Sequence, residues 1–152
     1  MPKFRRRPAS EAPYMGPNYY DNIAFTIGVQ AGSVINVALV LQDANNNTIP
    51  GSDVTDIGPS QSGGEIGPAM AGFYLSDNAD GSTLTATAIT TIAIGTNGVI
   101  LNIPVAGKYF EAISTLAGLL DFNLTKNAAR TTYLCVIMPN GQVLVSPPIV
   151  FT

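Results

Sequence analysis

Two acidic residues close together in the chain are the first candidates for chemistry. Asp77 and Asp80 lie in the segment Asp77-Asn78-Ala79-Asp80-Gly81, which has the crowded side-chain oxygens that a calcium-binding loop uses, and a carboxylate pair can also perform acid–base catalysis. A complete calcium loop has a third acidic or amide position and a more distant Glu, and neither follows in register. We therefore interpret the segment as a polar turn that ends at Gly81.

The remaining residue types exclude most hydrolase mechanisms. The 152 residues include no histidine, so the Ser/His/Asp and Cys/His triads and the commonest ligand of transition metals are missing. The one cysteine, Cys135, lies in an apolar strand pattern and is expected to be a buried structural thiol. Residues 63–67 are glycine-rich, but they match neither phosphate-binding motif and open no helix. We expect a protein that is not an enzyme and uses no cofactor and no metal.

Basic groups are concentrated at the N-terminus. The first seven residues carry four of the seven, and three prolines and three tyrosines follow, with almost no aliphatic residue, before residue 22. We interpret residues 1–22 as an extended arm, whose four basic and two acidic groups give +2, whereas three basic and eight acidic groups give the remainder −5. The arm residues predicted to contact a partner are Lys3, Phe4, Arg5, Arg6, Arg7, Tyr14, Tyr19 and Tyr20.

The chemistry of the arm leaves several partners open. Arginines interleaved with tyrosines can hold nucleic acid, an anionic surface or the acidic face of a protein, and four charges can also form no more than a solvated tip. Protein contact is favoured over nucleic acid, because the acidic body would repel nucleic acid held close to it.

Neither a membrane span nor a signal peptide is expected. The longest uncharged run, residues 81–107, is interrupted every few residues by Thr, Asn or Gly and is closed by Pro104. The basic start is followed by Pro8, Ser10 and Glu11, where a signal peptide would need an apolar segment, so we expect the mature protein to begin at Met1.

Alternation with period two recurs along the chain and predicts an all-β fold. The expected core faces are Phe25, Ile27 and Val29; Ile35, Val37, Leu39 and Leu41; Phe73 and Leu75; and Val99, Leu101, Ile103 and Val105. The predicted strands are residues 24–30, 34–42, 70–76, 83–88, 91–94, 99–104, 109–114, 131–138 and 142–151. Residues 112–120 have room for one or two helical turns.

The residues between these strands predict the connections. Asn97-Gly98 and Asn140-Gly141 supply the positive φ angles of tight hairpins, so a return strand is expected at Val99 and at Val143. Residues 51–67 are rich in Gly, Pro and Ser without periodicity and are expected to form a long exposed loop. Pro147 and Pro148 place the last strand at a sheet edge or give it a bulge.

Size and composition predict one domain that contacts other proteins. Residues 23–152 can form one core, and the strand spacing is that of a β-sandwich. Only 11% of the residues are charged, against about 25% in an ordinary soluble domain. A surface made of Thr, Ser, Asn, Gly and apolar side chains usually faces another protein, so we expect self-association.

One segment resembles an immunoglobulin-like domain. Residues 128–136, with the Asn140-Gly141 hairpin after them, are similar to the F strand and F–G turn of such a domain, and Tyr133 lies two residues before Cys135 as in a tyrosine corner. The strand at 34–42 has no partner cysteine and the chain has no tryptophan, so an antibody-type domain is excluded. The expected fold is an immunoglobulin-like antiparallel β-sandwich preceded by an N-terminal arm.

The body of the chain, residues 23–152, also resembles a family of small virion proteins of tailed bacteriophages. The resemblance is carried by Ile27-Gly28-Val29-Gln30-Ala31-Gly32, Ala71-Gly72-Phe73-Tyr74-Leu75-Ser76-Asp77, Ile94-Gly95-Thr96-Asn97-Gly98 and Tyr133-Leu134-Cys135-Val136-Ile137-Met138-Pro139-Asn140-Gly141. It implies a head decoration, or cement, protein that binds the major capsid protein and lies on the capsid surface of the virion after synthesis in the host cytoplasm. It also implies a homo-oligomer, a trimer at a threefold site.

Two other classes of function stay open. A tail or surface module could bind host carbohydrate or protein through residues 51–67, although glycan platforms usually expose tryptophan and this chain has none. An enzyme built on Asp77 or Asp80 is the least favoured. Glycan binding would favour the first, and loss of turnover on substitution of either carboxylate would favour the second.

Overall fold

The computed structural model of the 152-residue chain describes residues 20–42, 46, 48, 69–138 and 140–152. This part contains ten β-strands and no helix, which confirms the all-β prediction. The strands are β1 (Asn22–Ile27), β2 (Val34–Gln42), β3 (Met70–Ser76), β4 (Thr91–Ile94), β5 (Val99–Val105), β6 (Tyr109–Ile113), β7 (Leu119–Thr125), β8 (Arg130–Ile137), β9 (Val143–Val145) and β10 (Ile149–Phe151).

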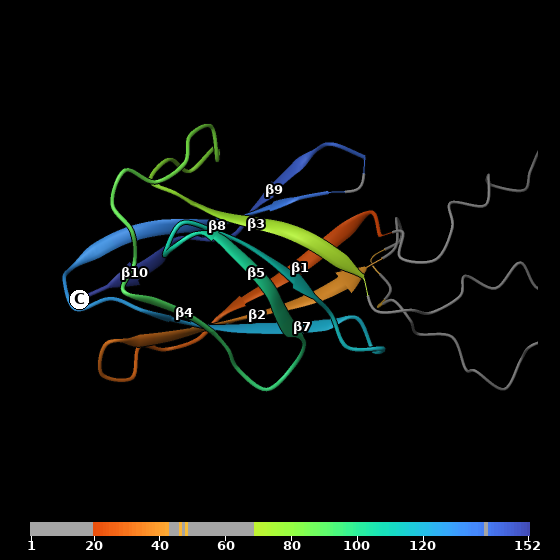
Figure 1. Ribbon diagram of the computed structural model, residues 1–152, viewed down its shortest axis with the longest axis horizontal. Coiled ribbons are helices and arrows are strands. Elements are labelled where there is room, and N and C mark those ends of the chain that lie inside the picture. Colours follow the sequence, from red (N-terminus) through yellow and green to blue (C-terminus); the bar gives the residue numbers. More distant parts are fainter. Residues whose placement is uncertain (1–19, 43–45, 47, 49–68, 139) are drawn as a thin grey trace, which may run out of the picture.

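The strands form two antiparallel sheets that pack face to face as a β-sandwich (Figure 1). The four-stranded sheet has the order β1-β2-β7-β4. The six-stranded sheet has the order β10-β8-β3-β6-β5, and β9 also pairs with β8. Strand β5 is therefore an edge of the six-stranded sheet, and its register on β6 shifts twice along its length.

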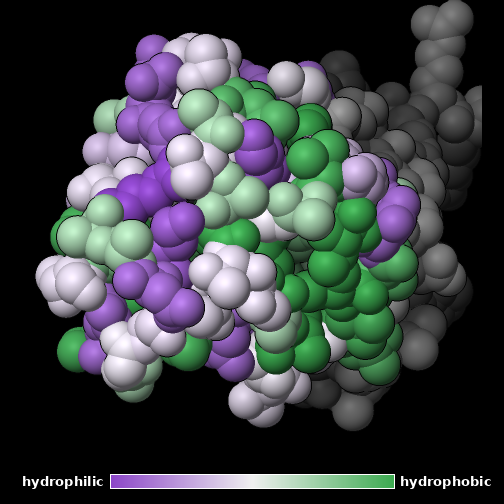
Figure 2. Space-filling model, turned by 60° about the vertical axis from the view of Figure 1, so that its left-hand side comes forward, coloured by the Kyte–Doolittle hydropathy of each residue, from purple (hydrophilic) through white to green (hydrophobic). Residues whose placement is uncertain are grey.

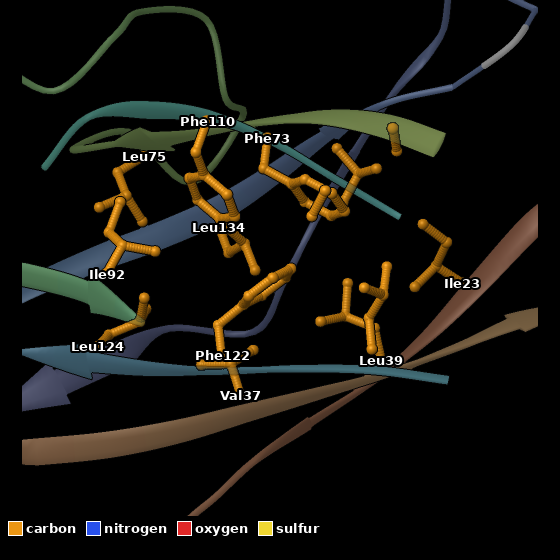
Figure 3. Packing of buried hydrophobic residues seen from close by; sticks show 14 of the residues in the cluster. Ile23, Val37, Leu39, Phe73, Leu75, Ile92, Phe110, Phe122, Leu124 and Leu134 are labelled. Carbon is orange, nitrogen blue, oxygen red and sulfur yellow. The ribbon is translucent and has the colours of Figure 1, made fainter. Parts of the chain in front are cut away.

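The core lies between the sheets because alternate residues of each strand point inward. Along β2, every second residue from Ile35 to Leu41 is buried. Three phenylalanines form the centre of the core: Phe73 and Phe110 come from the six-stranded sheet and Phe122 comes from the four-stranded sheet (Figure 3). Phe122 meets both other rings edge to face, with centroid distances of 5.0 and 4.8 Å. Aromatic contacts thus join the two sheets.

Strand β7 was not predicted, and the structure also differs from the prediction for the residues just before it. The one or two helical turns for which residues 112–120 have room do not form, because these residues contain the end of β6, a turn at Thr115–Gly118 and the start of β7. The alternation of Leu120, Phe122 and Leu124 with polar residues is the signal for this strand. It pairs with β2 on one side and with β4 on the other, so it completes the interior of its sheet.

One further strand prediction is wrong. Residues 83–88 form no strand but belong to an irregular connection, residues 77–90, between β3 and β4. The effect predicted for Pro147 and Pro148 is confirmed: they divide the strand expected at 142–151 into β9 and β10, because they cannot donate backbone hydrogen bonds, and β10 lies at an edge of the six-stranded sheet. Strand β1 ends at Ile27, so Val29 lies beyond it and is 95% exposed rather than in the core.

The two Asn-Gly predictions had different outcomes. At Asn140-Gly141 the hairpin is confirmed, since β8 and β9 pair across it and Gly141 has a φ of +85°. At Asn97-Gly98, Gly98 has a φ of +91°, but β4 and β5 belong to different sheets, so the turn is a crossover and the expected hairpin is wrong.

Strand β5 also differs from its predicted core face. The structure leaves all four predicted core residues of this strand exposed by 41 to 55%. Only Ile100 of this strand packs against the core. The alternation correctly predicted that β5 is a strand, but the side chains predicted to lie in the core are exposed to solvent. The prediction for Cys135 is confirmed, because its thiol is free and buried.

Candidate interaction surface

The structure describes one of the predicted arm residues. Tyr20 is 1% exposed and belongs to the core, where its hydroxyl has no hydrogen-bond partner among the described residues, and burial raises its pKa to about 12. Its ring therefore packs within the sandwich and is not presented on the surface. Lys3, Phe4, Arg5, Arg6, Arg7, Tyr14 and Tyr19 lie outside the described residues. The loop predicted at 51–67 also lies outside them.

Asp77 anchors the connection between β3 and β4. Its carboxylate accepts hydrogen bonds from the Thr85 hydroxyl at 2.9 Å and the Ala86 backbone N–H at 3.1 Å, and it forms an ion pair with Arg130. Desolvation by itself would raise the pKa of Asp77, but these hydrogen bonds and the guanidinium charge lower it below its ordinary value. The carboxylate is therefore ionised, and it holds residues of the fold through these hydrogen bonds and the ion pair.

Asp80 has a separate local role. Its carboxylate accepts a 2.9 Å hydrogen bond from the Ser82 backbone N–H, and hydrogen bonds from Ser82 lower its pKa. Gly81 has a φ of +68°, and its carbonyl accepts a 2.5 Å hydrogen bond from the Tyr74 hydroxyl. The two carboxylates thus hold different parts of one turn. Among the described residues, no group of three His, Cys, Asp or Glu side chains could hold a metal ion.

All three basic residues of the chain outside the arm bind the 77–90 connection. Lys108 donates to the Ala86 carbonyl at 2.7 Å and Lys126 donates to the Ala88 carbonyl at 3.0 Å. Arg130 donates to the Thr87 carbonyl between them and to Asp77. Three cations therefore satisfy three successive carbonyl groups of an irregular segment.

Replacing Arg130 with methionine is expected to loosen this connection. The guanidinium is 13% exposed and its partner Asp77 is 40% exposed, so solvent screening limits the loss to about 1–2 kcal/mol in the free energy of unfolding. Urea denaturation measures the loss, and hydrogen exchange should become faster at residues 77–90. Lys108→Met removes one hydrogen bond without an ion pair and serves as the control. An Arg130→Met variant as stable as the wild type would contradict this role.

A third carboxylate, Asp121 on β7, has a structural role that the sequence did not predict. It accepts hydrogen bonds from the backbone N–H groups of Thr96 and Asn97 and from the Asn36 amide at 2.9 Å. Desolvation would raise its pKa, but these bonds lower it. The carboxylate fixes the crossover between the sheets, and a Cβ at Gly95 would lie only 1.8 Å from Asp121 Oδ2.

The outer faces of the two sheets differ in chemistry. Eight of the eleven exposed large hydrophobic residues in the described part lie on strands of the six-stranded sheet, and none lies on β1, β2, β4 or β7. The outer face of the four-stranded sheet combines half-buried apolar residues, among them Val34, Val40 and Leu119, with a polar set, Thr26, Asn36, Thr91, Asp121, Asn123 and Thr125. The four-stranded sheet thus has an apolar inside and a more polar outside.

Apolar side chains lie in two neighbouring rows on the outer face of the six-stranded sheet. One row begins with Val143 beside Ile137 and continues through Gly72 to Glu111, and in the other row Ile113 lies between Met70 and Val99. Ile137, Val143, Val99 and Met70 are 40, 41, 55 and 61% exposed. We call the apolar residues of these rows, together with the exposed apolar residues of the edge strand β5, the apolar face; its members are Met70, Val99, Leu101, Ile103, Val105, Ile113, Ile137 and Val143.

Other parts of the same sheet are covered by the chain itself. Gly81, from the 77–90 connection, lies close to Cys135, Val145 and Tyr74, and a Cβ at Gly81 would lie 3.0 Å from the Cys135 sulfur. Figure 2 shows the surface contrast: hydrophobic residues gather into a continuous area towards the right of the view, and hydrophilic residues lie mainly to its left.

Comparison with known proteins finds no match: no protein-family model, no curated protein and no solved structure is similar to this chain. The described residues contain no helix long and apolar enough to cross a membrane. The function is therefore argued from the chain's own residues.

Proposed function

We propose that this chain is a non-enzymatic structural protein of a tailed-bacteriophage virion, a decoration (cement) protein that attaches to the major capsid protein lattice through its N-terminal arm and stabilises the head. The observation that carries the proposal is the apolar face, since exposed apolar side chains grouped on one sheet suit a protein held in an assembly. The resemblance of the body to small virion proteins implies an immunoglobulin-like sandwich, and the two packed antiparallel sheets support this part of the proposal.

The use of the charged residues supports a structural role. Asp77, Asp80 and Asp121 each accept hydrogen bonds that hold a turn or connection in place. Their pKa values are lowered, whereas a catalytic acid or base near neutral pH needs a raised carboxyl pKa. These carboxylates fit a fold with fixed connections better than an active site.

The distribution of basic residues supports attachment through the arm. Lys108, Lys126 and Arg130 donate to backbone carbonyls of the body. The other four basic groups of the chain are Lys3, Arg5, Arg6 and Arg7. An acidic rim on the capsid lattice would thus pair with the arm, and this contact would weaken as salt rises.

Co-sedimentation with undecorated heads of the encoding phage tests the proposal. The full chain should bind at low salt, and Arg5→Gln combined with Arg6→Gln should weaken binding about tenfold or more, which corresponds to about 1.4 kcal/mol. Thr26→Glu combined with Thr91→Glu lowers the net charge by the same two units on the polar outer face and should bind like the wild type. No binding by the wild type, or equal binding by the arginine variant, would contradict the proposal.

A further inference from the structure

We infer that a cleft at one end of the sandwich is a binding site for a carboxylate group. The cleft lies between the turn that joins β7 to β8 and the irregular connection at residues 77–90. We call it the basic cleft; its lining residues are Asp77, Thr87, Lys126, Ala128, Ala129, Arg130 and Thr131. Its volume of about 480 Å³ is in the range of ligand-binding clefts, about 300–1,000 Å³. The inference does not depend on the capsid assignment, since it concerns the body of the chain alone.

The lining of the basic cleft carries a net positive charge. Lys126 directly follows β7 and Arg130 begins β8, so the short turn between them holds both cations at the same end of the sandwich. Asp77 pairs with Arg130 and neutralises one of the two charges. Lys126 donates to the Ala88 carbonyl, which carries no net charge, so its ammonium has no counter-ion among the described residues. An anion with a single negative charge would balance the charge that is left.

Both cations keep hydrogen-bond donors that the described part of the fold does not use. The Lys126 ammonium has three N–H groups and donates one of them, at 3.0 Å, to the Ala88 carbonyl. The Arg130 guanidinium has five N–H groups and donates three hydrogen bonds to the 77–90 connection. The Arg130 side chain is 13% exposed, so water reaches its other two N–H groups only in part. An anionic ligand oxygen in the cleft would satisfy these donors with charge-assisted hydrogen bonds.

Charge and shape favour a carboxylate over other anions. The planar fork of a guanidinium matches the two oxygens of a carboxylate, and the Lys126 ammonium adds a point charge beside it. A phosphate group carries more than one negative charge at pH 7, and its excess charge would be repelled by Asp77. The cleft is larger than a carboxylate alone, and Ala128 and Ala129 line it with methyl groups. The carboxylate therefore belongs to a molecule with a short apolar part, either an acidic segment of a protein or a free small acid.

Nuclear magnetic resonance titration of the full chain with acetate, at pH 7 and at constant ionic strength set with chloride, tests the inference. The backbone amides of residues 126–131 should shift and saturate, whereas those of β1 should not. Lys126→Gln should weaken binding about tenfold or more. Lys108→Gln is the matched control and should bind like the wild type, because it loses the same charge and a hydrogen bond to the same connection but lies outside the cleft. The amide spectra also check that both variants fold.

Three further ligands identify the source of the carboxylate and need no variant. A short peptide with one aspartate that binds more tightly than acetate, while its asparagine analogue does not bind, assigns the site to an acidic protein segment. Tighter binding of acetate than of the peptide assigns it to a free small acid, and both results support the site. Absence of saturable shifts at residues 126–131, equal binding by the two lysine variants, or tighter binding of phosphate than of acetate would overturn the inference.

Discussion

Replacing Phe122 with alanine is expected to lower the free energy of unfolding by about 4 kcal/mol. The side chain is fully buried, and it is the one ring of the aromatic centre that comes from the four-stranded sheet. Its removal takes away edge-to-face contacts with Phe73 and Phe110 and leaves a cavity between the sheets. Urea denaturation at pH 7 measures the loss.

Two control variants separate the cavity from a general effect of truncation. Phe122→Leu keeps an apolar side chain at the same place and should cost less than half as much as alanine. Phe25→Ala truncates a half-buried ring on β1, outside the aromatic centre, and should also cost less. A loss of under about 2 kcal/mol for Phe122→Ala would show that the three rings do not join the sheets as described.

Replacing Asp121 with alanine is expected to cost about 3 kcal/mol at pH 7. The side chain is 7% exposed, and its removal leaves the backbone N–H groups of Thr96 and Asn97 without their acceptor. The crossover from β4 to β5 would then lose its main attachment to β7. Thr125→Ala changes another polar residue of the same strand without such bonds and should be nearly neutral. Denaturation of both variants by urea measures the difference.

The cost of Asp121→Ala should depend on pH. The folded pKa of Asp121 lies below its unfolded value of about 3.9, so the carboxylate stabilises the fold fully above that value and loses this effect as pH falls through the folded pKa. The gap in unfolding free energy between wild type and variant should therefore be largest near neutral pH and shrink below about pH 4. An equal gap at pH 7 and pH 3 would contradict the role assigned to the ionised carboxylate.

Alternation in the sequence predicted most strands, but it did not always predict which side of a strand faces the core. Along β2 the apolar alternation matched the buried side, because every second residue from Ile35 to Leu41 is a large apolar residue, whereas the other side includes Asn36, Ala38 and Gln42. In β5 the same kind of alternation belongs to an exposed edge strand. A period of two shows that the two sides of a strand differ, but which side meets a core depends on the neighbouring strands.

The interior of the four-stranded sheet shows another limit. Strand β7 carries an alternating pattern, but Asp121 and Asn123 at its outward positions and the preceding glycine turn made it resemble a connection. The partners of Asp121 come from residues 24, 25 and 85 positions away. Local sequence does not encode such contacts, so neither this site nor the binding of the 77–90 connection by Lys108, Lys126 and Arg130 could be predicted.

Quantitative mass spectrometry of gradient-purified virions of the encoding phage is the most direct test of the proposed function. The account predicts that the chain is present in every preparation in a fixed ratio to the major capsid protein, and that the ratio persists in heads separated from tails. Absence of the chain from purified virions would contradict the structural role. A chain that stays with the tails alone would contradict the assignment to the head.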